Sequence, residues 1–165
     1  MREILFRGKP IGKIDEDFVY GSLGVISTDL VAIYQCEEYY EDIITLVDIG
    51  TVGQYTGLTD KNGKKIFEGD ILHFKAYRGG GFACPIGTDI YYRVLFGYCN
   101  PDMNTLTEYV GFWSLGKNYD EDDLYEYGNS ISYLVNSHGA CVIGNIHDCK
   151  AEDFLKWKVF KKVTL

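Results

Sequence analysis

Residues 54–74 read QYTGLTDKNGKKIFEGDILHF, and this stretch has the clearest strand-and-turn pattern in the chain. Asp60-Lys61-Asn62-Gly63 is typical of a tight hairpin turn, because Asn and Gly tolerate the positive φ that such turns require. Strand-forming residues flank the turn at Gln54–Thr56 and again at Lys65–Phe67. The stretch therefore predicts a β-hairpin.

A third strand is expected directly after this hairpin. Glycine at position 69 permits a bend or bulge, and a new strand begins at Asp70. Its alternation places Leu72, Phe74 and Ala76 on one face and the residues between them, His73 among them, on the other. The hairpin and third strand together predict the start of a small curved sheet.

Further strands are expected on both sides of this stretch, because short runs rich in β-branched and aromatic residues recur. They are predicted at residues 2–8, 18–20, 30–34, 43–47, 90–98, 109–113, 131–135 and 140–146. Residues 136–139 would form the turn between the last two. A short helix is predicted over residues 149–157, since the Asp148 carboxylate can cap its start. The strand pairing of residues 1–50 stays open.

Three motifs in this chain resemble the signature of the YopX family of phage and prophage proteins. The central motif lies between Gln54 and Ile71, the opening one reads Arg2-Glu3-Ile4-Leu5-Phe6-Arg7, and the closing one reads Val142-Ile143-Gly144-Asn145-Ile146-His147. The resemblance implies a mostly β domain with an SH3-like or half-barrel sheet. It also implies a phage-derived, oligomeric protein without an assigned activity, and it carries over no catalytic residue.

The expected fold class is thus mainly β, with a curved antiparallel sheet or SH3-like half-barrel and a short C-terminal helix. A chain of 165 residues is about the size of one domain. We expect a single YopX-like domain over residues 1–165. Within it lie a variable β region at 1–50, a core sheet with insertions at 51–148, and a short helix with a lysine-rich tail at 149–165.

Composition argues against direct nucleic-acid binding and against a membrane span. The chain has 24 acidic and 16 basic residues, a formal net charge of −8, whereas phosphate binding needs clustered Lys and Arg. No apolar run approaches the ~20 residues that span a bilayer. The N-terminus lacks the apolar region of a signal peptide, and the five cysteines form no CxxC pattern. We expect reduced thiols and a location in the bacterial host cytoplasm.

Candidate metal and catalytic groups are present but do not form recognised patterns. His138, Cys141, His147 and Cys149 are possible zinc ligands, yet their spacing differs from that of known zinc sites. The aspartates around Asp122 lack the glycine and glutamate of a calcium loop. Pairing Cys84 or Cys99 with His73 or His138 has no local motif behind it. We predict no catalytic residue, no metal and no cofactor.

The candidate interaction residues fall in two acidic segments and one basic tail. They are Glu37, Glu38, Tyr39, Tyr40, Glu41 and Asp42, then Asp120, Glu121, Asp122 and Asp123, and finally Lys156, Lys158, Lys161 and Lys162. The lysines are expected to pair with acidic surface of the same chain or of a neighbouring copy, such as Glu37–Asp42. A solubilising end and a nucleic-acid contact are the alternatives.

Three functional hypotheses follow from these observations. The first is a non-enzymatic accessory protein of phage or prophage origin that acts through self-assembly or through a host or phage protein partner. The second is an acidic inhibitor that binds a DNA-processing protein in place of phosphate. The third is a metal- or thiol-dependent enzyme, which the missing motifs disfavour.

Overall fold

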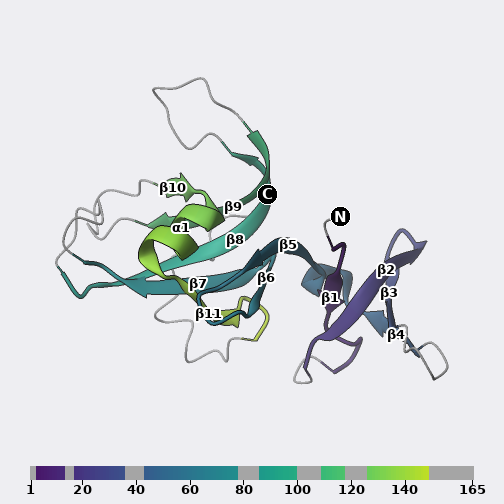
Figure 1. The fold of residues 1–165 in the computed structure, drawn as a ribbon. Helices are drawn as coiled ribbons and strands as arrows, with labels where there is room; N and C mark the ends of the chain where they lie inside the picture. The colour runs from purple at the N-terminus through teal and green to yellow at the C-terminus, as the bar shows by residue number, and fades with distance from the viewer. Residues whose placement is uncertain are drawn as a thin grey trace. The chain divides into compact units, whose positions relative to one another are not determined.

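The computed structural model describes residues 3–13, 17–35, 43–77, 86–99, 109–117 and 126–148. It divides into two compact units, which we call unit 1 (Met1–Gly57) and unit 2 (Leu58–Leu165). The described residues are mainly β, with curved antiparallel sheets, which confirms the predicted fold class (Figure 1). The expectation of a single domain over residues 1–165 stays a prediction.

Unit 1 contains most of a six-stranded antiparallel sheet with the strand order β4-β3-β2-β1-β5-β6. Its elements are β1 (Phe6–Gly8), β2 (Val19–Ser27), β3 (Leu30–Gln35), β4 (Ile43–Val47), the 3-10 helix η1 (Ile49–Thr51) and β5 (Gly53–Thr59), of which β5 continues into unit 2. Three buried side chains, Val31, Ile33 and Val47, form its small core. The strand pairing left open in the sequence is thus antiparallel throughout, with β1 between β2 and β5.

The predicted hairpin and third strand are present as β5, β6 (Lys65–Phe67) and β7 (Asp70–Lys75). Gly63 takes the positive φ of 82° that the turn requires, and Gly69 has a φ of 80° at the bend before β7. Leu72, Phe74 and Ala76 are all buried, as their shared face predicts. The pattern of the 54–74 stretch therefore predicted its local structure correctly.

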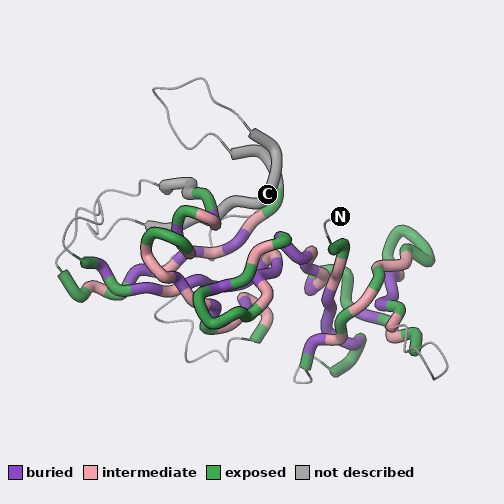
Figure 2. Tube along the Cα trace, in the orientation of Figure 1, coloured by how far each residue is buried: buried purple, intermediate pink, exposed green. Residues whose placement is uncertain are grey.

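Unit 2 is built on a five-stranded antiparallel sheet with the order β10-β9-β8-β7-β11. The strands not yet introduced are β8 (Asp89–Cys99), β9 (Tyr109–Lys117), β10 (Glu126–Asn129) and β11 (Cys141–Asn145). Its core is larger than that of unit 1, since inward residues of β7, β8 and β11 pack with two side chains from a helix. Figure 2 shows the buried residues continuing along β7 and β8.

The predicted strand at Ile131–Val135 is wrong, because these residues belong to the helix α1 (Ile131–His138). A short apolar run fits either structure, and here Ile131 and Leu134 are buried together at helical spacing. Gly139 ends the helix in the left-handed conformation, with a φ of 63°, and its N–H bonds back to the last turn. The segment predicted as a turn at 136–139 is therefore the end of the helix.

Several expectations lie outside the described residues. The predicted C-terminal helix at 149–157 and the lysine-rich tail are among them. The strand expected at residues 2–8 is present as β1, which is shorter and covers only Phe6–Gly8. Within the described ranges, no helix is long and apolar enough to cross a membrane.

Candidate functional site

Asp60 lies in the turn between β5 and β6 and accepts hydrogen bonds from backbone donors in two parts of unit 2. Its Oδ1 accepts hydrogen bonds from the backbone N–H of Asn62 (2.8 Å) and of Lys64 (2.9 Å). Its Oδ2 accepts one from the N–H of Val142 at 3.0 Å. Burial tends to raise the pKa of Asp60, but these bonds and the Lys64 charge outweigh it, so the pKa lies below 3.8. The carboxylate ties the hairpin turn to β11.

A second buried carboxylate, Asp70, ties the bend at Gly69 to the end of β11. Asp70 Oδ2 accepts a hydrogen bond from Phe67 N–H at 2.8 Å, and its Oδ1 lies 3.3 Å from Asn145 Nδ2. Asn145 Oδ1 in turn accepts from His147 N–H at 2.9 Å. A Cβ at position 69 would lie 2.9 Å from Asn145 Nδ2, so glycine is required there on steric grounds as well as for its φ. These polar groups link the bend at Gly69 to the end of β11.

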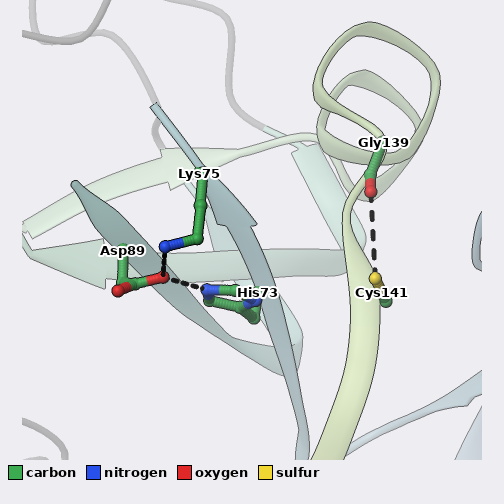
Figure 3. A network of polar contacts seen from close by, with 5 residues as sticks. All are labelled: His73, Lys75, Asp89, Gly139 and Cys141. Atoms are coloured by element: carbon green, nitrogen blue, oxygen red, sulfur yellow. Dashed lines mark hydrogen bonds and ion pairs between the residues drawn. The ribbon is translucent and has the colours of Figure 1, made fainter. Parts of the chain in front are cut away.

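An exposed polar cluster lies across β7 and β8, as Figure 3 shows. His73 Nε2 and Asp89 Oδ1 are 2.7 Å apart, and Lys75 Nζ lies 3.2 Å from the same oxygen. The hydrogen bond from His73, followed by that from Lys75, lowers the pKa of Asp89 below 3.8. Because the Asp89 side chain is exposed to solvent, this ion pair is a surface feature that contributes little to stability.

Two of the candidate metal ligands, His138 and Cys141, make contacts of another kind in the structure. His138 packs against the rings of Phe74, Tyr77 and Tyr133, with centroid distances of 4.9, 5.4 and 4.8 Å. Cys141 Sγ is directed at Gly139 O, 4.0 Å away (Figure 3). Burial lowers the pKa of His138 below 6.5. Among the described residues, no three His, Cys, Asp or Glu side chains could hold one metal ion.

All the interaction residues predicted from the sequence lie outside the described part of the chain. They are Glu37, Glu38, Tyr39, Tyr40, Glu41, Asp42, Asp120, Glu121, Asp122, Asp123, Lys156, Lys158, Lys161 and Lys162. These predictions therefore remain untested. Cys149, the fourth candidate zinc ligand, lies outside it as well.

Sequence reasoning missed a surface of unit 1 that we call the uncharged face. Register pairs place Ser22 beside Tyr34 and Gly24 beside Ala32, and then Tyr34 beside Ile44 and Ala32 beside Leu46. Strand alternation adds Tyr20 to this face. The uncharged face thus comprises Tyr20, Ser22, Gly24, Ala32, Tyr34, Ile44 and Leu46.

The uncharged face lies opposite the buried face that carries Val31, Ile33 and Val47. Within β2, β3 and β4 this face carries no charged side chain, but Arg7 of β1 pairs with Tyr20 and so borders it, and Ala32 within it is fully buried. Tyr34 lies over Gly24, where a Cβ would collide with its ring. Tyr20, Tyr34, Ile44 and Leu46 are all exposed. The alternation of 43–47 could have indicated this face, but a β-branched and apolar run interrupted only by Thr45 is typical of a strand buried on both sides.

This chain matches a model of a protein family and is similar to a solved structure. No curated protein matches the sequence. The crystal structure of protein EF1440 from Enterococcus faecalis is similar with a TM-score of 0.45 and 19% identity, covering 90% of this chain and 96% of that chain.

The family model described as YopX protein matches residues 25–80. This range contains β3, β4 and the whole of the central motif, whereas the opening and closing motifs lie outside it. The sequence resemblance to the YopX family is therefore confirmed over residues 25–80.

Proposed function

We propose that this chain is a non-enzymatic accessory protein that acts by binding other protein surfaces, including a second copy of itself. The observation that carries the proposal is the uncharged face, with four exposed aromatic or aliphatic side chains on one side of a sheet. Soluble domains rarely leave contiguous apolar surface open unless it is used for binding. A phage or prophage origin and a cytoplasmic location agree with the family resemblance and belong to the same proposal.

Affinity purification from host lysate tests the proposal, with recovered proteins identified by mass spectrometry. Leu46 has 43% of its surface exposed, so Leu46→Lys places a charge on the uncharged face without filling the core. We expect this variant to recover at least about tenfold less of a specific partner or of a tagged second copy. The matched control is Ile86→Lys in unit 2, which is 70% exposed and is not part of the uncharged face. Equal recovery by wild type and both variants would contradict the proposal.

A second candidate, an acidic inhibitor of a DNA-processing protein, is favoured by the net charge of −8. The two candidates respond oppositely to salt. An acidic inhibitor holds a basic partner by charge attraction, so salt weakens its complex. Association through the uncharged face persists or strengthens, since salt screens repulsion between acidic chains. A complex dissociated by moderate salt, and insensitive to Leu46→Lys, would favour the inhibitor.

A further inference from the structure

The sheet of unit 2 carries a half-buried arginine, Arg93, on the face that is turned away from α1. Its neighbours in β8, Tyr92 and Val94, pack in the core together with Ile131 and Leu134 of α1. Because side chains alternate along a strand, Arg93 between them points to the opposite face. We call this side of β7 and β8 the outer face.

The surroundings of Arg93 on the outer face are mostly apolar. The strand register places Ile71 of β7 directly opposite Arg93, and Ile71 is buried. Tyr91 and Leu95 lie two residues before and after Arg93, so they flank it on the same face, and both are half-buried. Such neighbours remove water from the guanidinium, and the aliphatic side chains among them offer it no hydrogen-bond acceptor.

The guanidinium of Arg93 lacks an acceptor at one of its nitrogens. Its Nε is buried and has no hydrogen-bond partner in the part of the chain that the structure describes. Burial lowers the pKa of Arg93, and the charge of Glu68, which raises this pKa, does not make up for the lost water. Native proteins seldom leave a buried donor without an acceptor. An acceptor supplied by a ligand would stabilise this group.

The carboxylate that β8 itself contributes to the outer face is already engaged. Asp89 bonds to His73 and Lys75, as Figure 3 shows. It also lies four residues before Arg93, which is about 13 Å along an extended strand. β11, on the other side of β7, has no charged residue. In these three strands the outer face therefore carries Lys75 and Arg93 against Asp89, so it attracts anions locally although the chain has a net charge of −8.

We propose that Arg93 anchors a binding site for a carboxylate group on the outer face of β7 and β8. Because Arg93 is only half-buried, a ligand reaches its guanidinium from solvent. A planar guanidinium donates two parallel hydrogen bonds to a carboxylate, and such bonds are strong where water is excluded. The site goes beyond the proposed function, because it lies in unit 2 and shares no residue with the uncharged face.

The charge around Arg93 favours a carboxylate over a phosphate group. A carboxylate carries one negative charge, which a single arginine balances. A phosphate group carries about −1.5 to −2 at neutral pH, so Glu68 and the acidic chain repel it more strongly. We expect inorganic phosphate to bind more weakly than acetate at the same ionic strength. Tighter binding of phosphate would overturn the assignment to a carboxylate.

The Nε–Hε signal of Arg93 in a proton–nitrogen NMR spectrum reports directly on this site. Acetate is the probe, exchanged for chloride on the full chain so that ionic strength stays constant. We expect the Arg93 signal to shift saturably with a Kd of about 1–10 mM, and Arg93→Lys identifies the signal by its loss. Arg7 is the control, since it is also buried but its guanidinium lies 4.4 Å from the centroid of the Phe18 ring. An Arg93 signal that stays in place, or that moves no more than the Arg7 signal, overturns the inference.

Arg93→Met is a second variant, which removes the charge but keeps an unbranched side chain that suits the apolar surroundings. Acetate at ten times its Kd should lower the unfolding equilibrium constant of wild type about tenfold, because it binds the folded chain. Arg93→Met should lose this effect, whereas Lys75→Met, on the same face, should keep it. Urea unfolding at constant ionic strength measures all three. Equal stabilisation of wild type and Arg93→Met by acetate contradicts the proposed site.

The carboxylate can belong to a small molecule or to a partner protein, and affinity purification separates the two sources. A partner's carboxylate is indicated if Arg93→Met recovers at least about tenfold less of that partner and acetate competes with it in wild type. A small carboxylate is indicated if recovery is unchanged while acetate binding is lost. A chain that binds no acetate overturns this inference and leaves the proposed function intact, since Leu46→Lys tests a surface of unit 1.

Discussion

The two units use polar and apolar residues in opposite ways. Unit 2 buries the carboxylates of Asp60 and Asp70 and satisfies them with backbone N–H groups, inside a large apolar core. Unit 1 has a core of few side chains and leaves isoleucine, leucine and tyrosine side chains of its sheet exposed. Buried polar groups that are fully hydrogen-bonded fix one arrangement of the chain, whereas exposed apolar groups gain stability only when something covers them. The contrast agrees with the proposal that unit 1 offers a binding surface, whereas the buried polar groups of unit 2 stabilise that unit's own fold.

The largest expected effect comes from truncating one leucine in each unit. Leu72 in unit 2 is fully buried, so Leu72→Ala should lower the free energy of unfolding by about 2–5 kcal/mol. Leu46→Ala on the uncharged face should lower it by less than about 1 kcal/mol. Urea unfolding followed by tryptophan fluorescence and circular dichroism measures both. A similar loss of unfolding free energy in both variants would contradict this contrast between the units, because Leu46 would then act as a core residue.

A smaller effect is expected from removing the Asp60 carboxylate. Asp60→Ala leaves the N–H groups of Asn62, Lys64 and Val142 without their acceptor, which should cost about 2 kcal/mol. Asp60→Asn keeps one carbonyl acceptor and should cost less. Urea unfolding at neutral pH measures both, with Asp89→Asn on the exposed cluster as the control. A neutral Asp60→Ala would mean that the turn and β11 are held together by apolar packing alone.

The lowered pKa of Asp60 also predicts how the stability of wild type and of the Asp60 variants changes in acid. A carboxyl whose pKa is depressed in the folded state stabilises the fold above its ordinary value of 3.8, and this contribution is lost as pH falls through the folded pKa. Wild type should therefore lose more stability than Asp60→Asn between neutral pH and about pH 3. Unfolding midpoints measured across this range test the sign. Parallel curves for the two proteins would show that Asp60 does not take part in acid unfolding.

The smallest effect is expected at His138, which packs among three aromatic rings in unit 2. Its pKa is lowered by burial, so the unfolded chain binds the proton more readily than the folded one. The stability that this neutral ring contributes is complete above pH 6.5 and is lost as pH falls below that value. His138→Phe keeps the ring packing and should flatten the stability profile between about pH 7 and pH 5. His73→Phe, on the exposed face of β7, is the matched control, and a profile unchanged in His138→Phe would refute the assignment.

Sequence patterns predicted strands better than they predicted surfaces. The hairpin turn, the bend at Gly69 and the buried face of β7 all follow from local rules that need no knowledge of the rest of the chain. The run Ile131–Val135 has no such local rule, because its apolar spacing fits a strand and a helix equally, and only burial beside β7 decides.

The uncharged face could not be predicted because it depends on which strands lie side by side. Ile44 and Leu46 are ordinary strand residues until the register places Tyr34 and Ala32 next to them. The buried role of Asp60 was missed for a similar reason, since its third hydrogen bond comes from Val142, 82 positions away in the chain. Runs of charged residues, by contrast, are easily seen in a sequence. Those predicted as interaction residues lie outside the described part of the chain.

The short contact between residues 9–11 and the end of β4 also limits how far such a chain can assemble. An uncovered edge of apolar residues can recruit one strand after another and grow into an open-ended fibril. Here Ile11 N–H donates to Leu46 O and Asp48 N–H donates to Lys9 O, so these outward groups of the strand are already hydrogen-bonded. Residues 9–11 thereby protect this part of the strand edge from pairing with another chain.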